Sequence, residues 1–189
     1  MKTKFPKNLN TEKNFISPIW ISNHEDKIYL KKLNNISDKY IKESKKINNK
    51  TTVFHSESLI NVPEYLELQD YVIATSRNLL LEMGYDLKEF EVCCTELWVQ
   101  EFDKKGGGHH SVHTHWNGHI SGFYFLKSSD KTSRPVFHDP RAGAVMNLLP
   151  ELDKTKLTHA SSQINYTTKP GTLIFFPSYL PHEYTVDLS

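Results

Sequence analysis

The N-terminal part of the chain carries apolar positions at helical spacing. Between Ile28 and Tyr40 these positions form one apolar stripe, which predicts an amphipathic helix. Asn23 is expected to cap this helix, with Glu25-Asp26 in the first turn and Lys45-Lys46 at the C-terminal end. Acidic residues at the start and basic residues at the end both favour the helix dipole, so the pattern predicts a helix that begins soon after residue 23.

A second apolar stripe runs from Leu66 to Leu80. The segment Asn61–Glu64 precedes it and has proline in the first turn, and Gly84 follows it, as is typical of the two ends of a helix. Ahead of both helices, Phe15–Ile21 is a short apolar run interrupted by a proline, which predicts an edge strand.

From residue 91 onward the pattern changes to short apolar runs separated by turn residues. The runs share β-branched and aromatic residues, and they predict strands over Glu91–Phe102, Ile120–Leu126, Arg134–His138, Val145–Leu149, Gln163–Thr168, Thr172–Phe176 and Glu183–Val186. Pro170-Gly171 is expected to form a hairpin-type turn. Short strands with regular turn signals indicate a sandwich or a barrel. We therefore expect one domain over residues 1–189, with 1–90 as a helical support region and 91–189 as the core barrel.

Composition excludes several classes of protein. Lys and Arg number 23 against 22 Asp and Glu, so bulk nucleic-acid binding is not expected. We find no apolar run of membrane-span length and no signal-peptide pattern, and we expect no membrane partner. The only cysteines, Cys93 and Cys94, are adjacent, and neighbouring cysteines rarely bridge. Reduced thiols predict a cytoplasmic protein.

The candidate chemistry centres on His113 and His115. In an extended segment, residues two apart project to the same face, so both imidazoles can aim at one point. A metal held there needs a further ligand from elsewhere, and His182, which follows an apolar run and a Pro-Ser turn, is the expected source. Imidazole suits iron, zinc, copper and nickel alike, so this pattern predicts a metal site more specifically than it predicts which metal.

Four blocks in this order resemble a known family. They are His113-Thr114-His115, Ser121–Leu126, Phe137–Arg141 and Phe176–His182. The chain is similar to the oxygenases that use Fe(II) and 2-oxoglutarate, and within them to a prolyl-hydroxylase-like branch common in phages and marine bacteria. The resemblance implies a mainly β fold with α, a double-stranded β-helix of jelly-roll or cupin-like type, with N-terminal helices packed on one sheet.

The resemblance also implies an activity. It is oxidative decarboxylation of 2-oxoglutarate coupled to hydroxylation of a substrate, with Fe(II) and 2-oxoglutarate as cofactors and dioxygen as co-substrate. A protein or amino-acid residue is the first expectation for the substrate. The implied location is the cytoplasm of a bacterium or of a phage-infected host.

Site residues follow from the same resemblance. His113, His115 and His182 are the expected metal ligands, and no catalytic residue is expected beyond them. Most of the superfamily has a carboxylate where His115 stands, so Asp139 is the alternative third ligand.

The far carboxylate of 2-oxoglutarate requires a partner as well. The superfamily places a basic residue after the distal histidine, and no basic residue follows His182 here. Either the chain ends before that residue, or Arg141 or Arg134 serves instead. Tyr124 and Phe125 occupy the positions where related enzymes use a tyrosine toward the same carboxylate, and strand alternation lets only one of them face inward.

Two other classes of function stay open at this level. The spacing of Gly107, His113, His115 and His119 also resembles a cupin motif, which would make the chain a cupin-like dioxygenase or isomerase without 2-oxoglutarate. The missing carboxylate ligand and the missing basic residue favour a non-catalytic binding module on the same barrel. Metal binding with and without 2-oxoglutarate distinguishes these classes.

Overall fold

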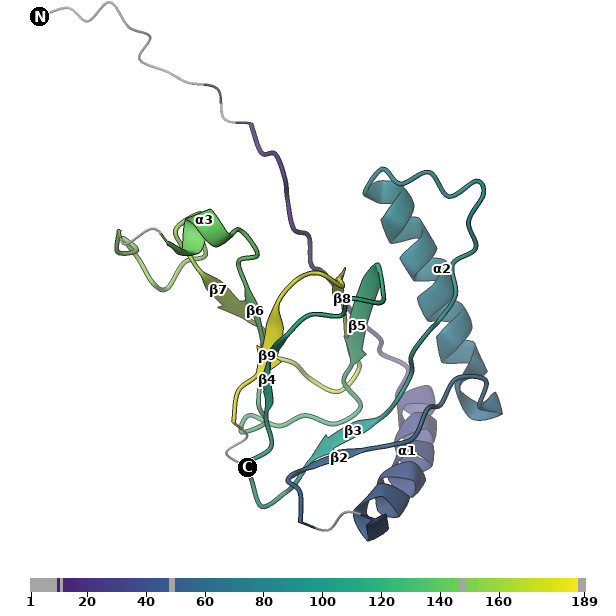
Figure 1. Ribbon diagram of the computed structural model, residues 1–189. Coiled ribbons are helices and arrows are strands. Elements are labelled where there is room, and N and C mark those ends of the chain that lie inside the picture. The colour runs from purple at the N-terminus through teal and green to yellow at the C-terminus, as the bar shows by residue number, and fades with distance from the viewer. Residues whose placement is uncertain (1–9, 11, 48–49, 147–148, 187–189) are drawn as a thin grey trace, which may run out of the picture.

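The computed structural model describes residues 10, 12–47, 50–146 and 149–186. Figure 1 shows two long helices on one side of a set of short strands. In chain order, the elements are β1 (Trp20–Asn23), α1 (Lys27–Ile47), β2 (Val53–His55), the 3-10 helix η1 (Pro63–Tyr65), α2 (Leu66–Glu82), β3 (Gln100–Phe102), β4 (His110–His113), β5 (Ile120–Tyr124), β6 (Pro135–His138), α3 (Ala142–Val145), β7 (Gln163–Asn165), β8 (Thr172–Pro177) and β9 (His182–Tyr184).

The strands form antiparallel sheets, with orders β1-β8-β5, β2-β3 and β4-β9-β6-β7. The main core lies between the first and the last of these sheets. Phe137 of β6 packs there with Ile174 and Phe176 of β8, and Phe123 of β5 packs against them. This arrangement confirms a mainly β protein with helices, and it is consistent with a β-sandwich.

Helices α1 and α2 cover the outer side of the β1-β8-β5 sheet (Figure 1). Leu79 of α2 packs against Leu173 and Phe175, while Leu33 of α1 lies in a cluster that includes Tyr124. Every residue of β8 is buried, because β8 has α2 on one side and β6 on the other. Within the described residues, neither these helices nor the short α3 combines the length and apolar character that a membrane crossing requires.

The start of α1 differs from expectation. The helix begins at Lys27, and the Oδ1 atom of Asp26 accepts hydrogen bonds from the backbone N–H groups of Ile28 (2.8 Å) and Tyr29 (2.9 Å). Asp26 therefore caps the helix. The expected cap, Asn23, lies in β1, where its side-chain oxygen accepts a hydrogen bond from the Thr172 hydroxyl. The edge strand accordingly covers Trp20–Asn23, because pairing with β8 fixes its position.

Two strand predictions and one turn prediction also need correction. Only the last three residues of the predicted strand Glu91–Phe102 form β3. The predicted strand Val145–Leu149 is wrong at its start, where residue 145 ends α3, and its residues 147–148 lie outside the described residues. The turn at Pro170-Gly171 does not make a hairpin, because β7 pairs with β6 whereas β8 pairs with β1 and β5.

At that turn, Gly171 forms hydrogen bonds with two segments that are distant from it in the sequence. Its N–H donates to the carbonyl of Phe125 and its own carbonyl accepts from the N–H of His24, each at 2.8 Å. Its φ of 93° favours glycine, and a Cβ there would lie 2.3 Å from the carbonyl oxygen of His24. We expect Gly171→Ala to lower the free energy of unfolding by about 2 kcal/mol or more, measured by urea denaturation.

Two other glycines supply matched controls. Gly84 has a similar φ of 91° but nothing within 4 Å of its Cβ position, so Gly84→Ala isolates the cost of backbone conformation. Gly143 in α3 has open space as well and is not among the positive-φ glycines, so Gly143→Ala should cost nothing. If Gly171→Ala destabilises the protein no more than Gly84→Ala does, the contact with His24 is not the cause.

Candidate metal centre

The candidate centre is built on the pairing of β4 with β9. His113 of β4 lies directly opposite His182 of β9 in the antiparallel register. Residues that face each other across a ladder project to the same side of the sheet, so the two imidazoles are brought together by backbone geometry alone. Their ring centroids are 4.3 Å apart.

His115 joins them from the segment that follows β4. Its backbone N–H donates to the carbonyl of Ser178 at 2.9 Å, which ties this segment to the turn before β9. The His115 ring lies 5.1 Å from the rings of both His113 and His182, centroid to centroid. Candidate ligand atoms of the three imidazoles all lie within 4.8 Å of one another.

Hydrogen bonds orient two of the rings. The Nδ1 atom of His113 is 2.7 Å from the carbonyl of Ser111, and the Nδ1 atom of His182 is 2.9 Å from the carbonyl of Leu180. Each Nδ1–H therefore donates to backbone, which leaves Nε2 as a free acceptor. Histidine ligands of metals commonly have this second hydrogen bond, because it fixes the tautomer and the ring orientation.

The Nε2 atom of His182 is the most informative atom of the site. It is buried and has no hydrogen-bond partner among the residues that the structure describes. An unpaired buried polar atom costs free energy, so its presence requires an explanation. A metal ion bound at Nε2 supplies one, because it takes the lone pair that no donor takes.

Burial favours the neutral form of His182 and of His115. It lowers the pKa of His182 to about 4, with a smaller contribution in the same direction from His113. Burial is also the main cause that lowers the pKa of His115, followed by the neighbouring His113. Neutral imidazole is the form that binds metals, so the donor set fits a divalent cation near neutral pH.

Asp139 is not part of this cluster of side chains. Its carboxylate accepts hydrogen bonds from the guanidinium of Arg141, with Nη2–Oδ2 at 2.6 Å and Nε–Oδ1 at 2.9 Å. This pairing is the first cause that holds the pKa of Asp139 below its ordinary value. The Asp-Pro-Arg segment is therefore a corner that an ion pair closes. In this ion pair, Asp139 and Arg141 are each other's partners.

The expected partners of the 2-oxoglutarate carboxylate lie elsewhere. The Tyr124 hydroxyl lies 2.9 Å from Nδ1 of His24, in the layer between the sheet and the helices. Phe125 faces the opposite way, into the core that contains Phe123. Strand alternation is the reason, and the residue that faces the imidazole side is the one without a hydroxyl. Arg134 lies in a surface depression beside Thr185.

Two polar residues near the imidazoles were not among the predicted site residues. The ring of His110 lies 5.1 Å from that of His113, and Tyr184 follows two positions after His182 on the same strand face. The spacing of Tyr184 from His182 could have identified the tyrosine. The position of His110 depends on a backbone irregularity in β4, which the pattern of residues does not predict.

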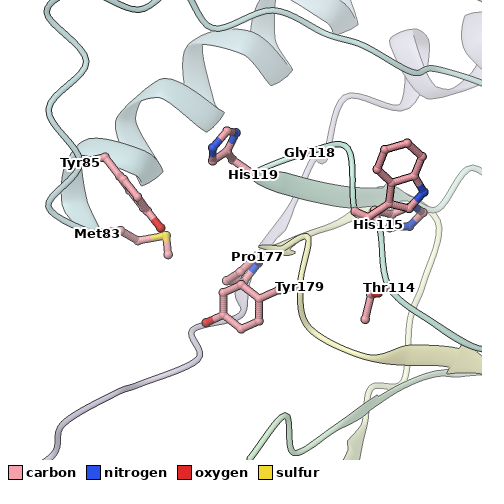
Figure 2. A pocket seen from close by; sticks show the side chains of 9 residues that line it. Met83, Tyr85, Thr114, His115, Gly118, His119, Pro177 and Tyr179 are labelled. Atoms are coloured by element: carbon pink, nitrogen blue, oxygen red, sulfur yellow. The ribbon is translucent and has the colours of Figure 1, made fainter.

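A cleft opens beside His115 (Figure 2). Its volume is about 340 Å³, and none of its described lining residues is Asp, Glu, Lys or Arg. In Figure 2, Met83 and Tyr85 lie on one side and His115 on the other, with Tyr179 between them. The residues that line the cleft include Met83, Tyr85, His115, Trp116, His119 and Tyr179.

The aromatic rim of this cleft is held by backbone contacts. The N–H of Ser178 donates to the carbonyl of His119 at 3.0 Å, and the Ser178 hydroxyl lies 2.8 Å from that of Ser121. These contacts fix the segments that carry Trp116 and Tyr179, although 92% of Trp116 is exposed. Contiguous exposed apolar side chains can mark a binding surface, and the exposed Trp116 and Tyr179 both line this cleft.

Comparison with known proteins places these residues in a family context. No curated protein matches the chain. Residues 96–187 match a protein-family model described as "Putative 2OG-Fe(II) oxygenase". All three clustered histidines lie inside the matched segment. Over this segment, the chain is similar to that family of oxygenases.

Proposed function

We propose that this protein is an Fe(II)- and 2-oxoglutarate-dependent dioxygenase that hydroxylates a substrate, with a protein or amino-acid residue as the first candidate. One observation carries the proposal: the buried, unpaired Nε2 of His182 lies against His113 and His115 within the segment that matches the oxygenase family model. A cytoplasmic location and a single domain over residues 1–189 stay predictions.

In this proposal His113, His115 and His182 hold the Fe(II). When bound, the cofactors supply the oxidative chemistry: 2-oxoglutarate and dioxygen become succinate and carbon dioxide, and one oxygen atom enters a substrate C–H bond. The protein holds and orients the reactants and excludes water. The rings of three phenylalanines, Phe123, Phe137 and Phe176, surround His182. They form an apolar surface that excludes water, as such chemistry requires.

The ligand set proposed here has a histidine in place of the usual carboxylate. Three neutral imidazoles leave a divalent metal with a higher net charge than two imidazoles and one carboxylate do. A dianionic 2-oxo acid would balance that charge on binding. This ligand set corresponds to the branch that the sequence resembles, and we extend the proposal to its double-stranded β-helix fold, for which the two facing sheets are the supporting observation.

We place the substrate in the cleft beside His115. The cleft reaches one of the proposed ligands directly, and its described walls include Tyr85, Trp116 and Tyr179 but no Asp, Glu, Lys or Arg. An uncharged group can enter such a cleft without loss of charge solvation, whereas a charged group would have no partner there. The cleft therefore favours an uncharged side chain as the part of the substrate that is hydroxylated.

The test is anaerobic titration of the metal-free protein with Fe(II), with and without 2-oxoglutarate. A 2-oxo acid chelated to Fe(II) gives a weak visible charge-transfer band, and we expect that band only when both are present. His115→Ala should weaken Fe(II) binding, whereas His115→Asp, which restores a carboxylate, should retain both metal and band. His159→Ala alters an exposed histidine outside the cluster and should change nothing.

A second candidate function is a cupin-like metalloprotein that does not use 2-oxoglutarate. The observation that favours it concerns the two candidates for the far carboxylate: Arg141 is paired with Asp139, and Arg134 lines a depression that includes none of the three imidazoles. Fe(II) binding without the 2-oxoglutarate band would support this candidate and contradict the dioxygenase proposal. Absence of any metal binding would favour a non-catalytic binding module.

A further inference from the structure

A backbone irregularity in β4 places two further polar residues, His110 and Tyr184, next to the imidazoles. His113 pairs with His182 and His110 pairs with Tyr184, so three positions along β4 match two positions along β9. The extra residue in β4 makes this a bulge. Without it, residues three apart would face opposite sides of the sheet. With it, His110 and His113 share a face, and their rings lie 5.1 Å apart.

Tyr184 lies in apolar surroundings. The Tyr184 ring packs edge-to-face on Phe102 and on Phe123, at centroid distances of 5.5 and 5.2 Å. The Tyr184 hydroxyl can donate a hydrogen bond. Across the described part of the chain, neither this hydroxyl nor the ring of His110 has a hydrogen-bond partner.

Gly108 packs closely against Phe102, the residue on which the Tyr184 ring packs. A Cβ on Gly108 would lie 2.6 Å from the Cβ of Phe102, so only glycine lets the start of β4 approach this close. That approach fixes Phe102 against Tyr184. Two unpaired polar groups held beside a candidate metal centre by a bulge and a glycine contact form a built site, and bulges near active sites often serve to aim side chains.

We propose that His110 and Tyr184 form a subsite for the far carboxylate of 2-oxoglutarate. This inference rests on the proposed function. Tyr184 lies two residues from His182, and two residues along a strand span roughly 7 Å, a gap that a five-carbon dicarboxylate can bridge. The Tyr184 hydroxyl and a His110 ring N–H are hydrogen-bond donors, and a carboxylate accepts from both.

The subsite predicts how the protein distinguishes 2-oxo acids. Tyr184→Phe removes one hydroxyl and keeps the ring that packs on Phe102, so the fold should be retained. We expect this change to weaken 2-oxoglutarate binding to the metal-loaded protein about tenfold or more. Binding of pyruvate, a 2-oxo acid without the second carboxylate, should not change. His110→Phe should show the same selective loss.

The experiment is anaerobic calorimetric titration of the Co(II)-loaded protein with each 2-oxo acid, without substrate or dioxygen. Affinity for Co(II) alone is measured first for each variant and should equal that of the unaltered protein for Tyr184→Phe. Tyr166→Phe is the matched control, because Tyr166 also lies in the core, where it packs on Phe137. It should bind both acids as the unaltered protein does.

The outcomes separate this inference from the function on which it rests. Binding of both acids with no selective loss in Tyr184→Phe would overturn the subsite and leave the dioxygenase proposal standing. A selective loss in Tyr166→Phe rather than Tyr184→Phe would also overturn it. Failure of the unaltered, metal-loaded protein to bind either acid would overturn both proposals.

Discussion

Replacing His182 with alanine is expected to lower the affinity of the protein for Fe(II) or Co(II) by at least about 100-fold. His182 is fully buried, its ring is held by the carbonyl of Leu180, and its Nε2 has no other partner among the described residues. His113 and His115 alone would leave a two-histidine site in which fewer protein ligands hold the ion. Calorimetry or a competing chelator measures the change.

The control for this prediction is a histidine of the same sheet that faces the other way. His138 of β6 bonds Glu183 through Nε2 at 3.0 Å, and His138→Ala should leave metal affinity unchanged. Because a buried residue is removed, circular dichroism must show that His182→Ala folds, and His182→Asn supplies a smaller change of shape. A folded His182 variant with undiminished metal affinity would rule out His182 as a ligand.

The metal-free protein is expected to lose stability as the pH falls from about 6.5 toward about 4. The folded protein keeps His182 neutral, with its pKa lowered to about 4, whereas in the unfolded chain the pKa is near the ordinary value of 6.5. Between these values the unfolded chain binds a proton that the folded chain does not, so stability is full above this window and decreases with falling pH.

The size of this effect follows from the shift. A pKa lowered from 6.5 to about 4 corresponds to about 3 kcal/mol across the window, and His115 and His110, whose pKa values are also lowered, act in the same direction. Urea denaturation of chelator-treated protein at several pH values measures it. His182→Leu should show a clearly smaller loss on acidification, and an equal loss would show that other groups cause it.

The three clustered histidines were predictable because their positions follow from local rules. Strand alternation places His113 and His115 on one face, and an apolar run followed by a Pro-Ser turn identified His182. The structure brings their rings together, as the sequence predicts. The two long helices were also predictable, because their apolar stripes and the glycine at position 84 are features of the chain itself.

The features that were missed depend on contacts between distant segments. Asn23 and Asp26 are both good helix caps, and pairing of β1 with β8 decides that Asp26 serves. Similarly, Tyr124 faces the helices because of the register in which β5 pairs with β8. The bulge that aligns His110 with Tyr184 arises between strands, so it cannot be read from β4 alone.

The position of β9 within its sheet sets the order in which the centre can assemble. β9 lies between β4 and β6, although both of those strands come earlier in the chain. During synthesis, His113 and His115 are therefore present long before His182 can insert between strands that are already made. Such non-local pairing is slow to form. We expect the metal to bind only after β9 has inserted. The bound ion then stabilises the sheet with β9 in place.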